Sequence, residues 1–218
     1  MTIFRRIMNL FKPAYPGPHY LIEFRFHGYA KKYLKEQIWD VGKKFKVKGI
    51  TRKQVVPHIS LIGPFTTKKQ KEIIPAFLKI CKKYDFLRFK LSDFDRFSNR
   101  VIYVTVNPSS KLIQFRQELF NTLEPKIKTV DTDYIEPFAF HSTVVFKDIE
   151  RKFDEIWTYL SNKKAKPINQ TLIRVTLIKG KKILYEYDFM QKRLLNRSQA
   201  LNKETMKKTL QILMSKKA

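Results

Sequence analysis

The chain has 218 residues, the length of one large domain or two small lobes, and 43% of them are hydrophobic. This apolar content supports a folded core and excludes disorder over the whole length. The charge is strongly basic, because 45 Lys and Arg residues face 19 Asp and Glu residues and give a net charge of +26. Such a chain attracts polyanions, above all nucleic acid. A general enrichment in lysine explains the charge equally well, since lysine is spread along the whole chain.

The sequence gives no sign of a bound metal or an organic cofactor. The one cysteine, Cys81, excludes an intramolecular disulfide, and no Cys and His grouping has zinc-ligand spacing. No Walker-type or dinucleotide-type glycine loop is present. No apolar run approaches the ~20 residues of a spanning helix, and the basic N-terminus lacks the features of a signal peptide. We therefore expect a cytoplasmic monomer with no cofactor and no membrane partner.

The first third of the chain alternates between strand and helix. Residues 1–18 are expected to form an N-terminal arm. The aromatic and β-branched run at 19–27 predicts a strand, and apolar residues close to helical spacing predict a helix over 30–45. A second strand over 55–65 and a second helix over 68–84 follow, by the same two patterns.

The rest of the chain continues this plan. Its expected elements are two strands, a helix capped by Ser109 or Ser110, a strand, a helix and a final hairpin, at 87–97, 100–106, 109–123, 138–146, 151–160, and 171–178 with 183–189. The tail, residues 191–218, carries eight Lys and Arg residues against the single acid Glu204. Its loose apolar stripe predicts a basic helix that either docks on the domain or forms an arm for nucleic acid.

This order of elements favours an α+β fold with two similar lobes over residues 19–190, and not a doubly wound parallel sheet. Each half of the chain holds one apolar strand that carries a His-x-Ser/Thr motif. The motifs are His58-Ile59-Ser60 and His141-Ser142-Thr143. In a strand, residues i and i+2 share a face, so each histidine points the same way as the hydroxyl two residues later.

Two such strands facing across a groove would bring two imidazoles and two hydroxyls together. One neutral imidazole can then take a proton while the other, as imidazolium, protonates a leaving oxygen, near the ordinary histidine pKa of ~6.5. The Ser60 and Thr143 hydroxyls can donate to phosphate oxygens. This set suits cleavage of a phosphodiester. From spacing alone, two half-buried histidines bonded to neighbouring hydroxyls remain an alternative.

These residues resemble the two-histidine phosphoesterase superfamily, and within it the 2′–5′ RNA ligase and 2′,3′-cyclic phosphodiesterase branch. The similarity covers roughly residues 20–189. It implies a bilobal fold in which two antiparallel sheets with flanking helices surround a central groove, and metal-independent opening of a cyclic phosphate to a 2′-phosphate. It also implies that His58 and His141 are the acid–base pair and that Ser60 and Thr143 bind phosphate.

The sequence departs from the family pattern at two positions. Ser60 stands where threonine is commoner, which keeps the hydroxyl. Phe140 stands where proline often precedes the second histidine, which could alter the strand geometry but removes no chemical group.

Four further residues are candidates for substrate contacts. For Arg25 the alternatives are a contact to phosphate or a salt bridge with Glu23, and for His27 they are an approach to the groove or packing at its rim. Tyr185 and Tyr187 could stack a base or belong to the aromatic core.

The resulting hypothesis is an RNA 2′,3′-cyclic phosphodiesterase that could also join 2′–5′ linkages. Its expected partner is an RNA or nucleotide that carries a 2′,3′-cyclic phosphate. The alternatives are a non-catalytic basic RNA-binding protein on the same fold, or a phosphodiesterase of 2′–5′ oligoadenylate or small cyclic nucleotides.

Overall fold

Two antiparallel sheets form the centre of the fold in the computed structural model, which describes residues 18–47, 55–146 and 149–216. The first sheet has the order β2-β1-β7-β8-β9 and the second has the order β5-β4-β3-β6. The strands of the first sheet are β1 (Tyr20–Arg25), β2 (His58–Phe65), β7 (Arg174–Lys179), β8 (Lys182–Asp188) and β9 (Arg193–Leu195). Those of the second are β3 (Leu87–Phe97), β4 (Val101–Pro108), β5 (His141–Phe146) and β6 (Ile168–Leu172). The fold is therefore α+β, as expected. The expected N-terminal arm lies outside the described residues, apart from Pro18.

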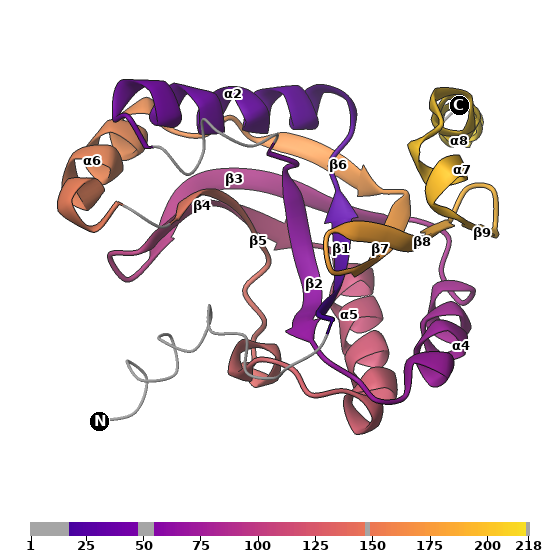
Figure 1. The fold of residues 1–218 in the computed structure, drawn as a ribbon. Helices are drawn as coiled ribbons and strands as arrows, with labels where there is room; N and C mark the ends of the chain where they lie inside the picture. The colour runs from indigo at the N-terminus through magenta and orange to yellow at the C-terminus, as the bar shows by residue number, and fades with distance from the viewer. Residues whose placement is uncertain (1–17, 48–54, 147–148, 217–218) are drawn as a thin grey trace.

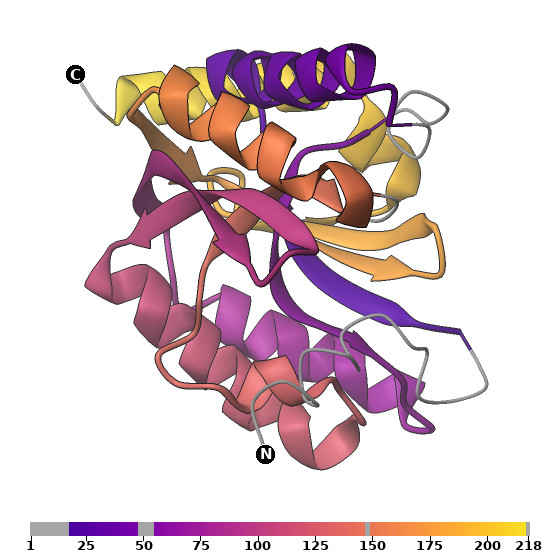
Figure 2. The same ribbon diagram turned by 90° about the vertical axis from the view of Figure 1, so that its left-hand side faces the viewer.

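Helices cover the sheets on two opposite sides (Figures 1 and 2). Helices α2 and α6 lie on one side, α4 and α5 lie on the other, and α7 and α8 lie beside β8 and β9. Their bounds are α2 Gly28–Lys44, α4 Gln70–Cys81, α5 Ser110–Leu123, α6 Phe153–Lys163, α7 Arg197–Leu201 and α8 Lys203–Ser215. Short 3-10 helices span Glu124–Lys126, Asp131–Tyr134 and Glu150–Lys152. The side chain of Ser109 caps α5 by accepting a hydrogen bond from the Leu112 backbone N–H, as the sequence suggested.

The predicted strand over 171–178 is wrong, because the chain changes sheets inside it. Thr171 and Leu172 end β6, an edge strand of the second sheet, and Arg174 begins β7 in the first sheet. Polar residues in β6 hide it from a search for apolar alternation. The change of sheet at Ile173 joins the two sheets covalently.

The core forms where the two sheets and the helices press apolar side chains together. On β1, Ile22 and Phe24 alternate with polar residues and are buried. The Phe24 ring meets the Phe89 ring of β3 edge to face, with centroids 5.4 Å apart. This contact packs the apolar face of the first sheet toward the second. Cys81 of α4 is buried in the same core, which raises the pKa of its thiol, as expected for a packed cysteine.

The basic tail is folded onto the first sheet over the residues that the structure describes. Strand β9 pairs with β8, so the tail supplies the outer strand of this sheet. Asn196 and Asn202 cap α7 and α8. Thr209 and Leu213 of α8 are buried, whereas its lysines are exposed. The tail thus contributes both buried structure and exposed positive charge.

Candidate active site

The two His-x-Ser/Thr motifs lie where the sheets meet. Strands β2 and β5 are edge strands of their sheets, and they contact each other. Each strand begins at its motif histidine, His58 in β2 and His141 in β5. The intervening residues, Ile59 and Ser142, are fully buried. Alternation along each strand therefore puts the histidine and its partner hydroxyl together on the other face, away from the buried residue.

Both imidazoles are held in the same way. His58 Nδ1 lies 2.9 Å from the carbonyl oxygen of Val56, and His141 Nδ1 lies 2.8 Å from the carbonyl oxygen of Ala139. A carbonyl oxygen only accepts hydrogen bonds, so Nδ1 carries a proton and donates it in each case. Nε2 is therefore the nitrogen that can exchange a proton with a substrate.

The hydroxyls of the motifs are available to a ligand. Ser60 and Thr143 are only partly buried. Within the described part of the chain, neither side chain makes a hydrogen bond to another protein group. This argues against the alternative in which each hydroxyl is used to hold its neighbouring histidine.

Charged side chains surround His58. In the register of β1 and β2, Arg25 lies opposite His58 and Glu23 lies opposite Ser60. Glu23 is 4% exposed, and its Oε2 lies 3.8 Å from His58 Nε2. Its other oxygen lies 3.9 Å from Nε of Arg25. Burial raises the pKa of Glu23, while the positive charges of His58 and Arg25 act in the opposite direction.

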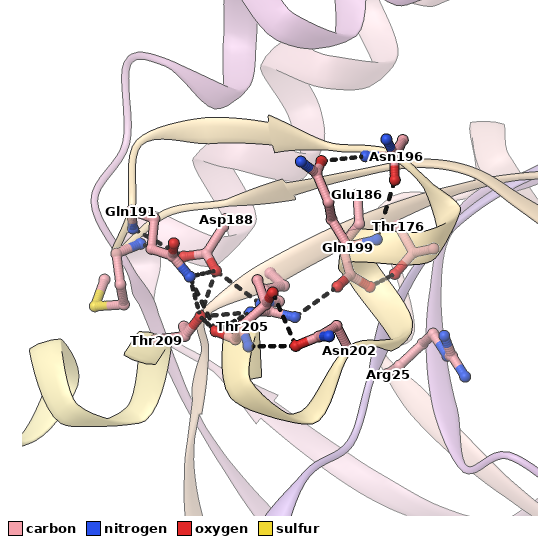
Figure 3. Close-up of polar contacts among 12 residues, drawn as sticks. Arg25, Thr176, Glu186, Asp188, Gln191, Asn196, Gln199, Asn202, Thr205 and Thr209 are labelled. Carbon is pink, nitrogen blue, oxygen red and sulfur yellow. Dashed lines mark hydrogen bonds and ion pairs between the residues drawn. The ribbon is translucent and has the colours of Figure 1, made fainter. Parts of the chain in front are cut away.

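A buried polar network continues from Glu23 across the sheet. Thr176 lies opposite Glu23, and Glu186 lies opposite Thr176 and accepts its hydroxyl hydrogen bond at 2.7 Å. Arg174 binds Glu186 at 3.1 Å and Asp188 at 2.8 Å. It also donates to the Thr205 carbonyl oxygen of α8. Figure 3 shows Glu186 beside Thr176, and Asp188 beside Thr209. Helix α8 is thus tied to the sheet face that carries Glu23 and His58.

Aromatic side chains surround His141 instead. Phe97 meets the imidazole edge to face at 4.9 Å, and Tyr103 lies at 5.1 Å between ring centroids. Burial lowers the pKa of His141, and the charge of His58 lowers it further. The hydrogen bond to Ala139 acts in the opposite direction. The strands that carry His58 and His141 contact each other, in keeping with this effect of His58.

The other predicted substrate contacts divide into two groups. Arg25 lies beside His58, and it also forms the salt bridge to Glu23 that the sequence left open. His27 is turned toward β6, where its Nε2 lies 3.3 Å from the Thr171 carbonyl oxygen and 3.2 Å from Gln170 Nε2. This geometry supports the packing role for His27 and not the substrate contact.

The base-stacking role suggested for Tyr187 is wrong, whereas that of Tyr185 stays a prediction. Alternation along β8 puts both rings on the face opposite to Glu186, where Tyr185 is only half-buried. Tyr187 is 1% exposed and packs against Phe189, with ring centroids 5.3 Å apart. The aromatic-core alternative is thus the correct one for Tyr187.

A buried arginine links the two motif strands. Arg116 of α5 donates to the Leu61 carbonyl oxygen of β2 and to the Asp133 carbonyl oxygen, at 3.3 and 2.6 Å. Asp133 in turn accepts from the Gly63 backbone N–H at 2.8 Å and from the Thr129 hydroxyl. Because this segment leads into β5, the cluster fixes the approach of both motifs. Sequence spacing gave no signal for it.

The described residues contain neither a candidate metal site nor a membrane-spanning helix. No group of three or more His, Cys, Asp or Glu side chains could hold a metal ion among them. No helix in that part of the chain has the length and apolarity needed to cross a bilayer.

The family model of the 2′-5′ RNA ligase superfamily matches residues 35–182, a span that includes both motifs. The chain belongs to this superfamily. It is the two-histidine group that the motifs of the sequence resemble, so this prediction is confirmed. No curated protein matches the chain.

Two solved structures are similar to this 2′-5′ RNA ligase superfamily member. Escherichia coli LigT complexed with 3′-AMP is 16% identical, with a TM-score of 0.43 over 82% of this chain and 92% of LigT. Kluyveromyces marxianus Usb1 with uridine monophosphate is 10% identical, with a TM-score of 0.44 over 76% of this chain and 96% of Usb1.

Proposed function

We propose that this protein is an RNA phosphodiesterase that opens a 2′,3′-cyclic phosphate to a 2′-phosphate, with His141 as general base and His58 as general acid and without a metal. The observation that carries the proposal is the matched pair of histidines. Each has Nδ1 fixed by a carbonyl and Nε2 free to exchange protons, and each has an unused hydroxyl two residues later. Membership of the superfamily supports a phosphoesterase.

The two histidines are held alike but have different surroundings, and this difference supports separate roles. The aromatic rings around His141 favour its neutral form, which suits a base. His58 instead has a carboxyl group beside it, since Oε2 of Glu23 lies 3.8 Å from its Nε2, and we assign the acid to His58 on this contact. A pair of titratable groups in contrasting environments is the usual basis of acid–base catalysis.

The proposed step balances without another reactant. Nε2 of His141 takes a proton from water, whose oxygen forms a bond to phosphorus. The bond between phosphorus and the 3′-oxygen breaks, and Nε2 of His58 gives its proton to that oxygen. The phosphate remains on the 2′-oxygen. Ser60 and Thr143 donate to the non-bridging oxygens as their negative charge grows, and Arg25 adds a positive charge beside His58.

The direct test is incubation of the purified chain with a 2′,3′-cyclic mononucleotide in EDTA, with phosphorus NMR to separate the 2′-phosphate from the 3′-phosphate. We expect the 2′-phosphate alone. A 3′-phosphate product would reverse the assignment of the leaving oxygen. Salt-sensitive RNA binding with no turnover would favour the non-catalytic alternative. A cytoplasmic location, a monomeric state and 2′–5′ ligase activity stay predictions.

The pH profile tests the assignment of acid and base. A neutral His141 and a protonated His58 are needed together, so kcat/KM should follow a bell-shaped curve. Because burial lowers the pKa of His141, the acid limb should lie below pH ~6.5. Replacing Glu23 with glutamine removes the carboxylate that lies 3.8 Å from Nε2 of His58, so kcat/KM should fall in this variant if His58 is the acid.

The control for this profile is Glu72→Gln, which removes an exposed carboxylate from α4. It should leave kcat/KM unchanged. Glu23→Asp, which keeps the carboxylate, should restore part of the activity lost in Glu23→Gln. An unchanged kcat/KM in Glu23→Gln would remove the basis for assigning the acid to His58.

A further inference from the structure

A row of positive charge leads away from His58 along helix α2. Only Phe26 and His27 separate Arg25, the last residue of β1, from Gly28, the first residue of α2. Figure 1 shows that α2 begins at the end of the first sheet where β1 ends and β2 starts. Lys31 and Lys35 follow at helical spacing on one face of α2.

These cations are crowded and are not neutralised by acids. The pKa of Lys31 is lowered by burial and by the charges of Lys35 and Arg25. Neither lysine has a carboxylate partner within the described part of the chain. The nearby Glu36 lies 4.0 Å from Lys32 and is engaged there. Like charges four residues apart destabilise a helix, so this row favours binding of an anion.

The same face of α2 carries a hollow that ends at an aromatic ring. The hollow has a volume of about 460 Å³ and is lined by Gly28, Lys31, Lys32, Lys35, Glu36 and Trp39. Trp39 is 46% exposed, although Lys43 lies 5.6 Å from its ring centroid. Trp39 lies about 12 Å beyond Lys31 along the helix axis. An exposed ring at the end of a basic row is the arrangement that binds single-stranded nucleic acid, by stacking a base and neutralising the phosphates.

We propose that this face of α2, formed by Lys31, Lys35 and Trp39, binds the single-stranded RNA that leads to the reacting phosphate. This inference rests on the proposed function and deepens it, because it makes an RNA strand the preferred substrate over a free cyclic nucleotide. Lys31 and Lys35 bind the phosphates, and Trp39 stacks on a base farther from the reacting end.

The test compares binding and turnover. A fluorescent single-stranded RNA with an unmodified 3′ end measures Kd by anisotropy over a series of salt concentrations. The double variant Lys31→Gln with Lys35→Gln should weaken binding about tenfold and reduce the slope of log Kd against log salt by about 1.4, which corresponds to two phosphates. Trp39→Ala should weaken binding about tenfold with little change in slope. The ratio of kcat/KM for an oligonucleotide with a cyclic phosphate to kcat/KM for a cyclic mononucleotide should fall in both the lysine variant and Trp39→Ala.

Matched controls remove the same groups elsewhere. Lys71→Gln with Lys79→Gln takes two exposed lysines from α4, and Tyr29→Ala removes an exposed ring of α2 that does not line the hollow. Equal losses of RNA binding in these controls would overturn the proposal. A second result would also overturn it. If the lysine variant loses oligoglutamate binding as much as RNA binding, and Trp39→Ala leaves RNA binding unchanged, the face is a general polyanion surface. If the wild type binds RNA but opens no cyclic phosphate, the proposed function fails and the RNA site stands.

Discussion

Alanine at His58 or at His141 should lower kcat for opening of a 2′,3′-cyclic phosphate by at least ~100-fold, because each variant removes one of the two proton-transfer groups. Each variant loses an Nε2 that the fixed Nδ1–carbonyl contact holds ready for proton exchange. Product formation under saturating cyclic mononucleotide measures kcat directly. KM should change much less, since each variant keeps the phosphate contacts proposed for Ser60, Thr143 and Arg25.

The double variant separates a concerted pair from two independent contributions. If the histidines act in one step, combining the substitutions should cost little more than either alone, because groups that act as a unit are not additive. His19→Ala is the matched control, since His19 precedes β1 at the end of that strand away from Arg25. Full activity in either single variant would refute the acid–base pair.

The motif pair could be predicted from the sequence because each motif depends only on residues that are neighbours in the chain. The period of two in a strand fixes which residues share a face, so His58 with Ser60 and His141 with Thr143 follow from spacing alone. The partners of the histidines could not be predicted in this way. Glu23 reaches His58 only through the register of β1 on β2.

Partners from distant parts of the chain were also missed. Phe97 and Tyr103 approach His141 through the pairing of three strands. The carboxylate of Asp133 is buried against Arg116 of α5, a contact that no motif in the sequence predicts. Such contacts depend on which elements become neighbours, which hydrophobic periodicity does not encode. Tyr187 illustrates the same limit, since only the register of β8 shows that it faces the core.

The sequence of the tail was compatible with two different structures. Its basic residues and apolar stripe were compatible with either a docked helix or a free arm. The deciding residues are polar ones: Thr209 donates to Asp188, and Gln191 donates to the Thr205 carbonyl oxygen. Thr209 and Asp188 both contact Arg174 of β7, so the position of α8 depends on a buried ionic cluster as well as on apolar burial.

Replacing Arg174 with methionine should lower the free energy of unfolding by about 3–5 kcal/mol, because it leaves buried charge without its partner. Arg174 is 3% exposed and neutralises Glu186 and Asp188, which are 3% and 0% exposed. Glu23 lies close enough to Glu186 to feel its charge, so three carboxylates would then share one low-dielectric region. Urea denaturation followed by circular dichroism measures the loss.

The matched control is Lys83→Met, which breaks an exposed ion pair of similar length. Lys83 lies 2.7 Å from Glu118, and its side chain is 51% exposed, so this change should cost no more than ~1 kcal/mol. Adding Glu186→Gln to Arg174→Met should restore part of the stability, since one uncompensated charge is removed. If Arg174→Met costs no more than Lys83→Met, the cluster contributes little, and apolar packing around Leu213 holds α8 in place. If the cost is large and kcat/KM for the cyclic phosphate also falls, α8 and the surroundings of His58 are coupled through Glu186 and Glu23.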